Sequence, residues 1–399
     1  MFLRLGWFMA LWLSAPSVGL PQTLLDVYRS GRVVLAPDPA YAADVNWDKL
    51  APSPNKQLTA APDGSVFISS GKECRIFKFD PSGRLVAQFG QKGQGPGDFQ
   101  YPGTLSILDQ QYLVVSEFAE SRRFSLFDLS GKFAKLHSSK KALFGAQAIG
   151  GGRVAAMVKI TGPLQTNGWK QTAEVIVIDT ASGVERKVFS REESIDTIIK
   201  GRRMVVKGRV IASELSVASL PDGVLAVGDP TKPAVDLFSP EGAKIRSIVL
   251  KIPPLFVTRE YLASFKKGRI VEAVRQSSQT DPDKLGQWIS EEEDGYLGRA
   301  RPYFTVLWAD DEGRLLVFKS PLLYGDPPRF QVYDGQGTFL AEAELDAGPW
   351  ALTFDSRFRK IAFSSHGVFS IFPRLDDEME TPVLARTRLA ADAGGSGKR

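Results

Sequence analysis

The sequence predicts an all-β protein, specifically a six-bladed β-propeller with a helical insertion between blades four and five. Residues 63–102 contain three short apolar-alternating runs, two tight turns and a glycine-rich crossing, and looser copies recur down the chain. The turn glycines Gly83, Gly131, Gly183, Gly242 and Gly337 are spaced by 48, 52, 59 and 95 residues. The first three spacings suit a four-stranded blade of roughly 40–50 residues plus loops, and the fourth suits one blade plus an insertion.

The first copy shows why these segments are expected to be strands. Residues 75–79 (RIFKF) alternate apolar and polar side chains, as a half-buried strand does. Residues 80–83 (DPSG) form a turn, since proline presets one dihedral angle and glycine supplies a positive φ. A degenerate sixth copy spans residues 350–373 and needs an outer strand, which either residues 32–36 or residues 382–389 can supply. The N-terminal segment is the slightly preferred choice.

The insertion covers about residues 253–302 and is expected to hold two helices. Thr258 and Asp281 are candidate N-caps, and Pro282 suits a first helical position. Apolar residues follow at helical spacing and are expected to face a surface that the helices cover. They are Tyr261, Leu262, Phe265, Val271 and Val274 in the first helix and Leu285, Trp288 and Ile289 in the second.

The N-terminus predicts export. Arg4 precedes a short apolar run, residues 5–13, and Ser17-Val18-Gly19 offers a cleavage site, so residues 1–19 are interpreted as a signal peptide. Residues 20–389 form the propeller, and the small, polar residues 390–399 are expected to be disordered. No later stretch is apolar enough for a transmembrane segment, which predicts a periplasmic or extracellular protein. The single cysteine, Cys74, is expected to be a buried apolar residue.

Composition and charge point to a protein with a substantial core and an ordinary solvated surface. The chain is 43% hydrophobic and 24% charged. It carries a net charge of +5, and its basic residues are interspersed with acidic ones. The basic run at residues 200–203, with Lys207 and Arg209, is the best anion-binding candidate, although a solvated loop is the simpler interpretation. An exported protein is not expected to bind nucleic acid.

The glycine-rich residues 93–99 do not suit a phosphate loop. Asp98 stands where the dinucleotide fingerprint requires its third glycine, and a strand follows instead of a helix N-terminus. The segment is therefore interpreted as a crossing between blades, in which Phe99 fills the gap.

Candidates for catalysis are few. His137, His366 and Cys74 are too scattered for a zinc site, which needs three or more ligands. No nucleophile elbow accompanies a Ser/His/Asp triad. We therefore expect no catalytic residue and no cofactor, with a Ca²⁺ site built from Glu73, Asp98 and Asp229 left open. Such carboxylates also pair with arginine in many propellers.

The chain resembles the NHL-repeat family, in particular exported bacterial six-bladed propellers. Residues 89–102 look like the NHL signature, and RIFKFD (75–80), RFSLFD (123–128) and RFQVYD (329–334) look like the strand before it. Asp229 stands where these repeats often place an aspartate, but Ala234 replaces the arginine. The resemblance covers most of residues 57–373. It implies a six-bladed ring that binds protein, RNA or small molecules. Some members are lyases or hydrolases with metal-binding residues near the channel.

Propeller connectivity predicts where a ligand binds. Crossings between blades share one face with the loops that join second and third strands, and all the long, irregular segments are of these two kinds. Since long loops on a rigid scaffold usually carry binding sites, we expect a non-enzymatic propeller that binds a protein, peptide or glycan there. A metal-dependent lyase or hydrolase is the alternative. The expected binding residues are Tyr101, Glu120, Arg122, Trp169, Lys232 and Tyr324. The three aromatic side chains are expected to be exposed, and a packing role is an equal alternative for each.

Overall fold

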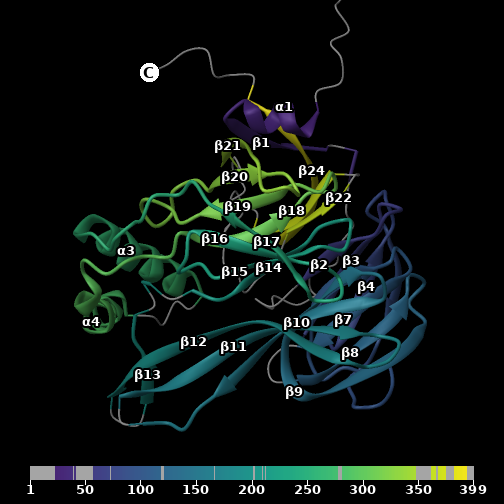
Figure 1. The fold of residues 1–399 in the computed structure, drawn as a ribbon, viewed down its shortest axis with the longest axis horizontal. Coiled ribbons are helices and arrows are strands. Elements are labelled where there is room, and N and C mark those ends of the chain that lie inside the picture. Colours follow the sequence, from purple (N-terminus) through teal and green to yellow (C-terminus); the bar gives the residue numbers. More distant parts are fainter. Residues whose placement is uncertain are drawn as a thin grey trace, which may run out of the picture.

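The structure is a computed structural model, and it is built mainly from short antiparallel strands (Figure 1). It describes residues 23–38, 40–41, 57–71, 73–117, 121–165, 167–200, 203–208, 210–211, 213–276, 281–346, 361–364, 367–373 and 382–392. The predicted signal peptide, Glu120 and His366 lie outside these ranges. None of the helices within them is long and apolar enough to cross a membrane.

Two sheets contain four strands each, in simple antiparallel order. The first comprises β2 (Leu58–Ala60), β3 (Val66–Ser70), β4 (Arg75–Phe79) and β5 (Leu85–Phe89). The other comprises β14 (Ser216–Ser219), β15 (Leu225–Gly228), β16 (Ala234–Phe238) and β17 (Lys244–Val249). Each corresponds to one predicted copy of the repeat.

A third sheet joins two further copies through one long strand, β9 (Phe133–Gly150). Its first half pairs with β8 and its second half pairs with β10, so the chain passes from one copy into the next without a break. Before β9 come β6 (Pro102–Leu108), β7 (Tyr112–Glu117) and β8 (Ser121–Asp128). After it come β10 (Arg153–Thr161), β11 (Gly168–Asp179), β12 (Glu185–Lys200) and β13 (Arg203–Val206).

The fourth sheet unites the two ends of the chain. Its strands are β18 (Phe304–Ala309), β19 (Leu315–Lys319), β20 (Arg329–Tyr333), β21 (Phe339–Asp346), β22 (Ile361–Ser364), β23 (Gly367–Pro373), β24 (Pro382–Ala391) and β1 (Arg32–Pro37). β1 lies between β24, to which it is antiparallel, and β21, to which it is parallel. Both segments considered for the outer strand therefore join the sheet, with β1 outside β24. Ala390 and Ala391 pair with β1, so the disordered tail was predicted to begin too early.

Buried apolar clusters lie between successive groups of four strands. Phe67 and Ile76 pack with Leu105 and Leu113 in one such cluster, and the next groups along the chain are joined in the same way. The C-terminal strands also pack on the first sheet, because Phe369 and Leu384 share a cluster with Leu58, Ile68 and Phe77. The last strands of the chain therefore pack against the first four-stranded sheet.

The predicted turns are confirmed at the backbone level. Gly83, Gly131, Gly183, Gly242 and Gly337 all have positive φ, between 75° and 95°. Where an aspartate opens the turn, its carboxylate accepts backbone N–H groups inside the turn. Asp128, for example, accepts from Ser130 N at 2.9 Å and from Lys132 N at 2.9 Å. Each such aspartate therefore fixes the hairpin that it begins.

The turn aspartates predict a specific pH dependence. Hydrogen bonds from the Ser130 side chain and the Lys132 backbone lower the pKa of Asp128. A pKa lowered in the folded state stabilises the protein above the unfolded value of about 3.9 and loses that effect as pH falls through the folded value. Asp128→Ala should therefore lower the thermal midpoint at pH 7, and the gap from the parent should close below about pH 3.9. Lys132→Ala is the control, and an equal gap for Asp128→Ala at every pH would contradict the account.

The glycine-rich crossing is a packing element, as predicted. Phe99 is fully buried, and a side chain at Gly90 would place its Cβ 2.3 Å from the Phe99 ring. Asp98 turns back over its own loop and accepts a hydrogen bond from Gly95 N. Arg123 closes the crossing by donating to Gln94 O at 2.7 Å and pairing with Glu117 at 2.6 Å.

Two helices lie between β17 and β18, namely α3 (Arg259–Gln276) and α4 (Pro282–Glu293). Thr258 and Asp281 cap them as predicted. Their buried cluster contains Val210, Val257, Tyr261, Leu262, Phe265 and Ile289. The prediction that all of their apolar residues face the protein was wrong, however. Val271, Val274 and Trp288 are 47%, 41% and 48% exposed.

A short helix at the N-terminus, α1 (Leu24–Arg29), was not predicted. Its Tyr28 is fully buried and donates a hydrogen bond to Asp310 at 3.2 Å. Arg314 pairs with the same carboxylate at 2.7 Å, so α1 is held against the fourth sheet.

Candidate functional site

The helical segment is joined to two neighbouring loops. Arg301 lies 3.3 Å from the Tyr261 ring centroid and donates to Pro321 O and Leu322 O. Tyr324 N donates to Ser264 Oγ at 2.9 Å. On the other side, Glu293 accepts from Val210 N, which belongs to the connection between β13 and β14. The helices therefore cover the face that carries these long connections.

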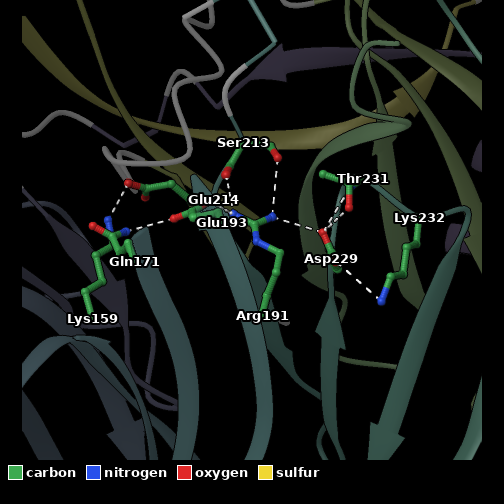
Figure 2. A network of polar contacts seen from close by, with 9 residues as sticks. All are labelled: Lys159, Gln171, Arg191, Glu193, Ser213, Glu214, Asp229, Thr231 and Lys232. Carbon is green, nitrogen blue, oxygen red and sulfur yellow. Dashed lines mark hydrogen bonds and ion pairs between the residues drawn. The ribbon is translucent and has the colours of Figure 1, made fainter. Parts of the chain in front are cut away.

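A network of charged and polar residues links two strand groups (Figure 2). Arg191 on β12 donates to Asp229 at 2.9 Å, to Glu193 at 2.5 Å and to Ser213 O at 2.7 Å. Asp229 follows β15 and also accepts from Thr231. Burial would raise the pKa of Asp229, but the hydrogen bonds from Thr231 and Arg191 outweigh it and hold this pKa below its ordinary value.

This network is mainly structural, because its two central side chains are buried. The side chains of Arg191 and Asp229 are only 9% and 3% exposed, and they meet through one hydrogen-bonded ion pair at 2.9 Å. Arg191 comes from the preceding strand group, so its pairing with Asp229 joins two groups. Lys232 pairs with Asp229 at 3.8 Å, and its side chain is 69% exposed, so it is accessible to a ligand.

The predicted site residues are not gathered in one place. The Tyr101 ring packs over Gly71, and the Trp169 indole nitrogen is buried, so both residues are half-buried and their expected exposure was wrong. Arg122 is exposed on β8. Tyr324 is 37% exposed and meets the Phe265 ring edge-on at 5.4 Å. Tyr324 therefore contacts the helical segment.

A cavity that the sequence did not indicate lies beside the loop that carries Tyr324. A cavity of about 80 Å³ is lined by Ile252, Pro253, Leu255, Lys319, Ser320, Pro321, Leu322, Asp326, Pro327 and Arg329. Large apolar side chains are exposed on the segments beside it, namely Phe256 (51%), Leu297 (46%), Leu322 (56%), Leu323 (41%) and Tyr324 (37%). We call these five residues and the cavity the mouth surface. Large exposed apolar side chains near a cavity are a common feature of binding sites.

The groups considered for metal or acid–base chemistry lie apart from the mouth surface. His137 is buried and stacks on Phe124 at 4.7 Å, and burial lowers its pKa despite the nearby Glu185. Cys74 is buried, with its thiol 3.1 Å from Gln100 O. Asp98 and Asp229 have separate partners. Among the described residues no three His, Cys, Asp or Glu side chains are grouped to hold a metal ion.

Comparison with known proteins finds a likeness in fold and none in sequence. The chain matches no known family profile and none of the curated proteins. A DUF4221 family member from Bacteroides vulgatus is similar at 10% identity and a TM-score of 0.50, over 91% of this chain and 100% of that one. A candidate exported protein from Bacteroides fragilis (10%, 0.44, 90% and 94%) and a calcium-binding protein, regucalcin, from Agrobacterium tumefaciens (11%, 0.36, 86% and 92%) are also similar. At these identities the likeness shows the fold alone.

Proposed function

We propose that the strand groups are six blades of a closed ring, with α3 and α4 inserted between blades four and five. Four-stranded pairing in each group and the buried clusters between successive groups support this assignment. The joining of β1 to β24 supports closure of the last blade by the N-terminal segment. Radial repetition lets each sheet bury both faces against its neighbours.

We further propose that the protein is an exported, non-enzymatic binding propeller whose ligand is a protein or peptide. The observation that carries this proposal is the mouth surface, with its five exposed apolar side chains beside a cavity. Leucine and phenylalanine provide little for the hydroxyl groups of a glycan, whereas they suit an apolar peptide side chain.

The rim of the cavity adds polarity to this site. Lys319 pairs with Glu342 at 2.7 Å and Arg329 pairs with Glu344 at 3.1 Å, so two ion pairs lie beside the cavity that Lys319 and Arg329 line. An apolar centre with a charged rim is the usual arrangement of a protein interface. The centre supplies affinity, and the rim selects the partner.

The proposal is tested by partner recovery from the producing cells. Leu323→Asp places a charge in the mouth surface and should reduce recovery of the partner at least about tenfold, because an unpaired charge must be desolvated on binding. Val184→Asp is the matched control, since Val184 is 61% exposed beside the Gly183 turn. Equal recovery with both variants, each with an unchanged thermal midpoint, would rule out the mouth surface as the site.

A further inference from the structure

One loop carries three of the five apolar residues of the mouth surface. It covers residues 320–328 between β19 and β20, contains no helix or strand, and bears Leu322, Leu323 and Tyr324. We call it the mouth loop. Asp326 shapes its tip by accepting a hydrogen bond from Leu323 N at 2.7 Å. This contact lies within the loop, so it does not determine where the loop lies against the rest of the protein.

The helix α3 provides a seat for the Tyr324 ring. Tyr324 N donates to Ser264 Oγ at 2.9 Å, and the ring meets that of Phe265 edge-on at 5.4 Å. One turn after Ser264, Gly268 leaves room for the ring, because a Cβ there would lie 2.1 Å from two ring carbons. Glycine is the least favourable residue after proline in a helix interior. The packing of Tyr324 therefore accounts for a glycine inside this 18-residue helix.

A second contact fixes the start of the mouth loop. Arg301 donates from Nη1 to Leu322 O at 3.2 Å and from Nη2 to Pro321 O. It is only 5% exposed, and its guanidinium lies over the ring of Tyr261, which also belongs to α3. Both carbonyl groups are therefore used within the protein, and a ligand would meet this part of the loop through its side chains.

We propose that α3 positions the mouth surface for its ligand and that Gly268 is a positioning residue, which acts through Tyr324. This role rests on the proposed function, since it concerns how that binding surface is held in shape. A loop that is already held in place loses little conformational freedom when a ligand binds, which favours affinity. With Tyr324 seated, Leu322 and Leu323 are 56% and 41% exposed beside the cavity. A displaced ring would move both side chains with it.

The test is hydrogen exchange of the mouth loop amides in the full exported chain, measured beside partner recovery from the producing cells. Gly268→Ala should speed the exchange of residues 322–326 about tenfold or more, because the new Cβ displaces the Tyr324 ring. Recovery of the partner should fall about tenfold as well. Gly286→Ala on α4 is the matched control, since a Cβ there would meet only Ile270 Cδ1 at 3.5 Å, an ordinary contact. It should exchange and bind as the parent does.

Ser264→Ala is the second variant, and it decides the question if Gly268→Ala lowers the thermal midpoint. Alanine is favoured in a helix, and this change removes the acceptor of Tyr324 N. Exchange of the Tyr324 amide should therefore become faster while the helix is retained. Exchange like that of the parent in both variants would overturn the proposal, because the loop would then not depend on α3.

Leu323→Asp separates this proposal from the proposed function. If Leu323→Asp lowers recovery while Gly268→Ala recovers the partner as the parent does, the mouth surface binds the partner and the positioning role of Gly268 is wrong. If both variants recover the partner as the parent does, although exchange is faster in Gly268→Ala, the proposed function itself fails. Loss of recovery in both, with faster exchange in Gly268→Ala alone, is the result that we expect.

Discussion

Asp229→Ala is expected to lower the free energy of unfolding by about 3 kcal/mol, one of the two largest effects of a single substitution in this protein. The substitution leaves the Arg191 guanidinium 9% exposed and without its main partner on the next strand group. The side chain and N–H of Thr231 lose their acceptor at the same time. Arg191 keeps Glu193, which places the expected cost at the lower end of that for breaking a buried ion pair. Urea denaturation followed by tryptophan fluorescence measures it.

Two variants test the cause of that loss. Asp229→Asn keeps an acceptor for Thr231 and should cost clearly less than alanine. Lys232→Ala removes a side chain that is 69% exposed at 3.8 Å from the same carboxylate, and it should cost no more than about 0.5 kcal/mol. If Asp229→Ala were as mild as Lys232→Ala, the Arg191 network would not join the two strand groups.

Phe99→Ala is expected to cost about 3–5 kcal/mol, the usual range for emptying a fully buried phenylalanine site. The Phe99 ring lies 5.6 Å from that of Phe127 and fills the space that Gly90 leaves open, so its loss creates a cavity between the first two strand groups. Phe99→Leu should cost less than about 1.5 kcal/mol because most of the volume is retained.

The matched comparison for this prediction is Phe256→Ala, at a position 51% exposed. Its unfolding free energy should change little, whereas recovery of a partner should fall because Phe256 belongs to the mouth surface. A loss of stability at Phe256 equal to that at Phe99 would show that exposure does not distinguish packing residues from binding residues here.

Much of the fold was predictable because its signals are local. A turn glycine needs only a positive φ, and the five predicted glycines have it. Strands such as residues 75–79 are also predictable, because the alternation of apolar and polar residues can be read from the local sequence. The continuous β9 and the extension of β12 into a hairpin with β13 were not predictable, since both depend on pairing with distant strands. The docking of α1 depends on Asp310, 282 residues beyond Tyr28.

The candidate site was less predictable because exposure is a property of the assembled protein. Tyr101 and Trp169 have the character of ligand contacts, yet both residues are half-buried. Helical spacing assigned Val271 and Trp288 to the buried side, but it cannot tell which side of a helix meets the protein. The partnership of Arg191 with Asp229 crosses 38 residues, so no local pattern indicates it.

The central claim is that the mouth surface binds a protein or peptide, and site-specific photocrosslinking in the producing cells tests it most directly. A crosslinking amino acid at Leu323 should yield one discrete adduct, and the same group at Val184 should yield none. Both positions are exposed, and only Leu323 lies beside the cavity. An adduct at Val184 with none at Leu323, or no adduct at either position, would contradict the claim.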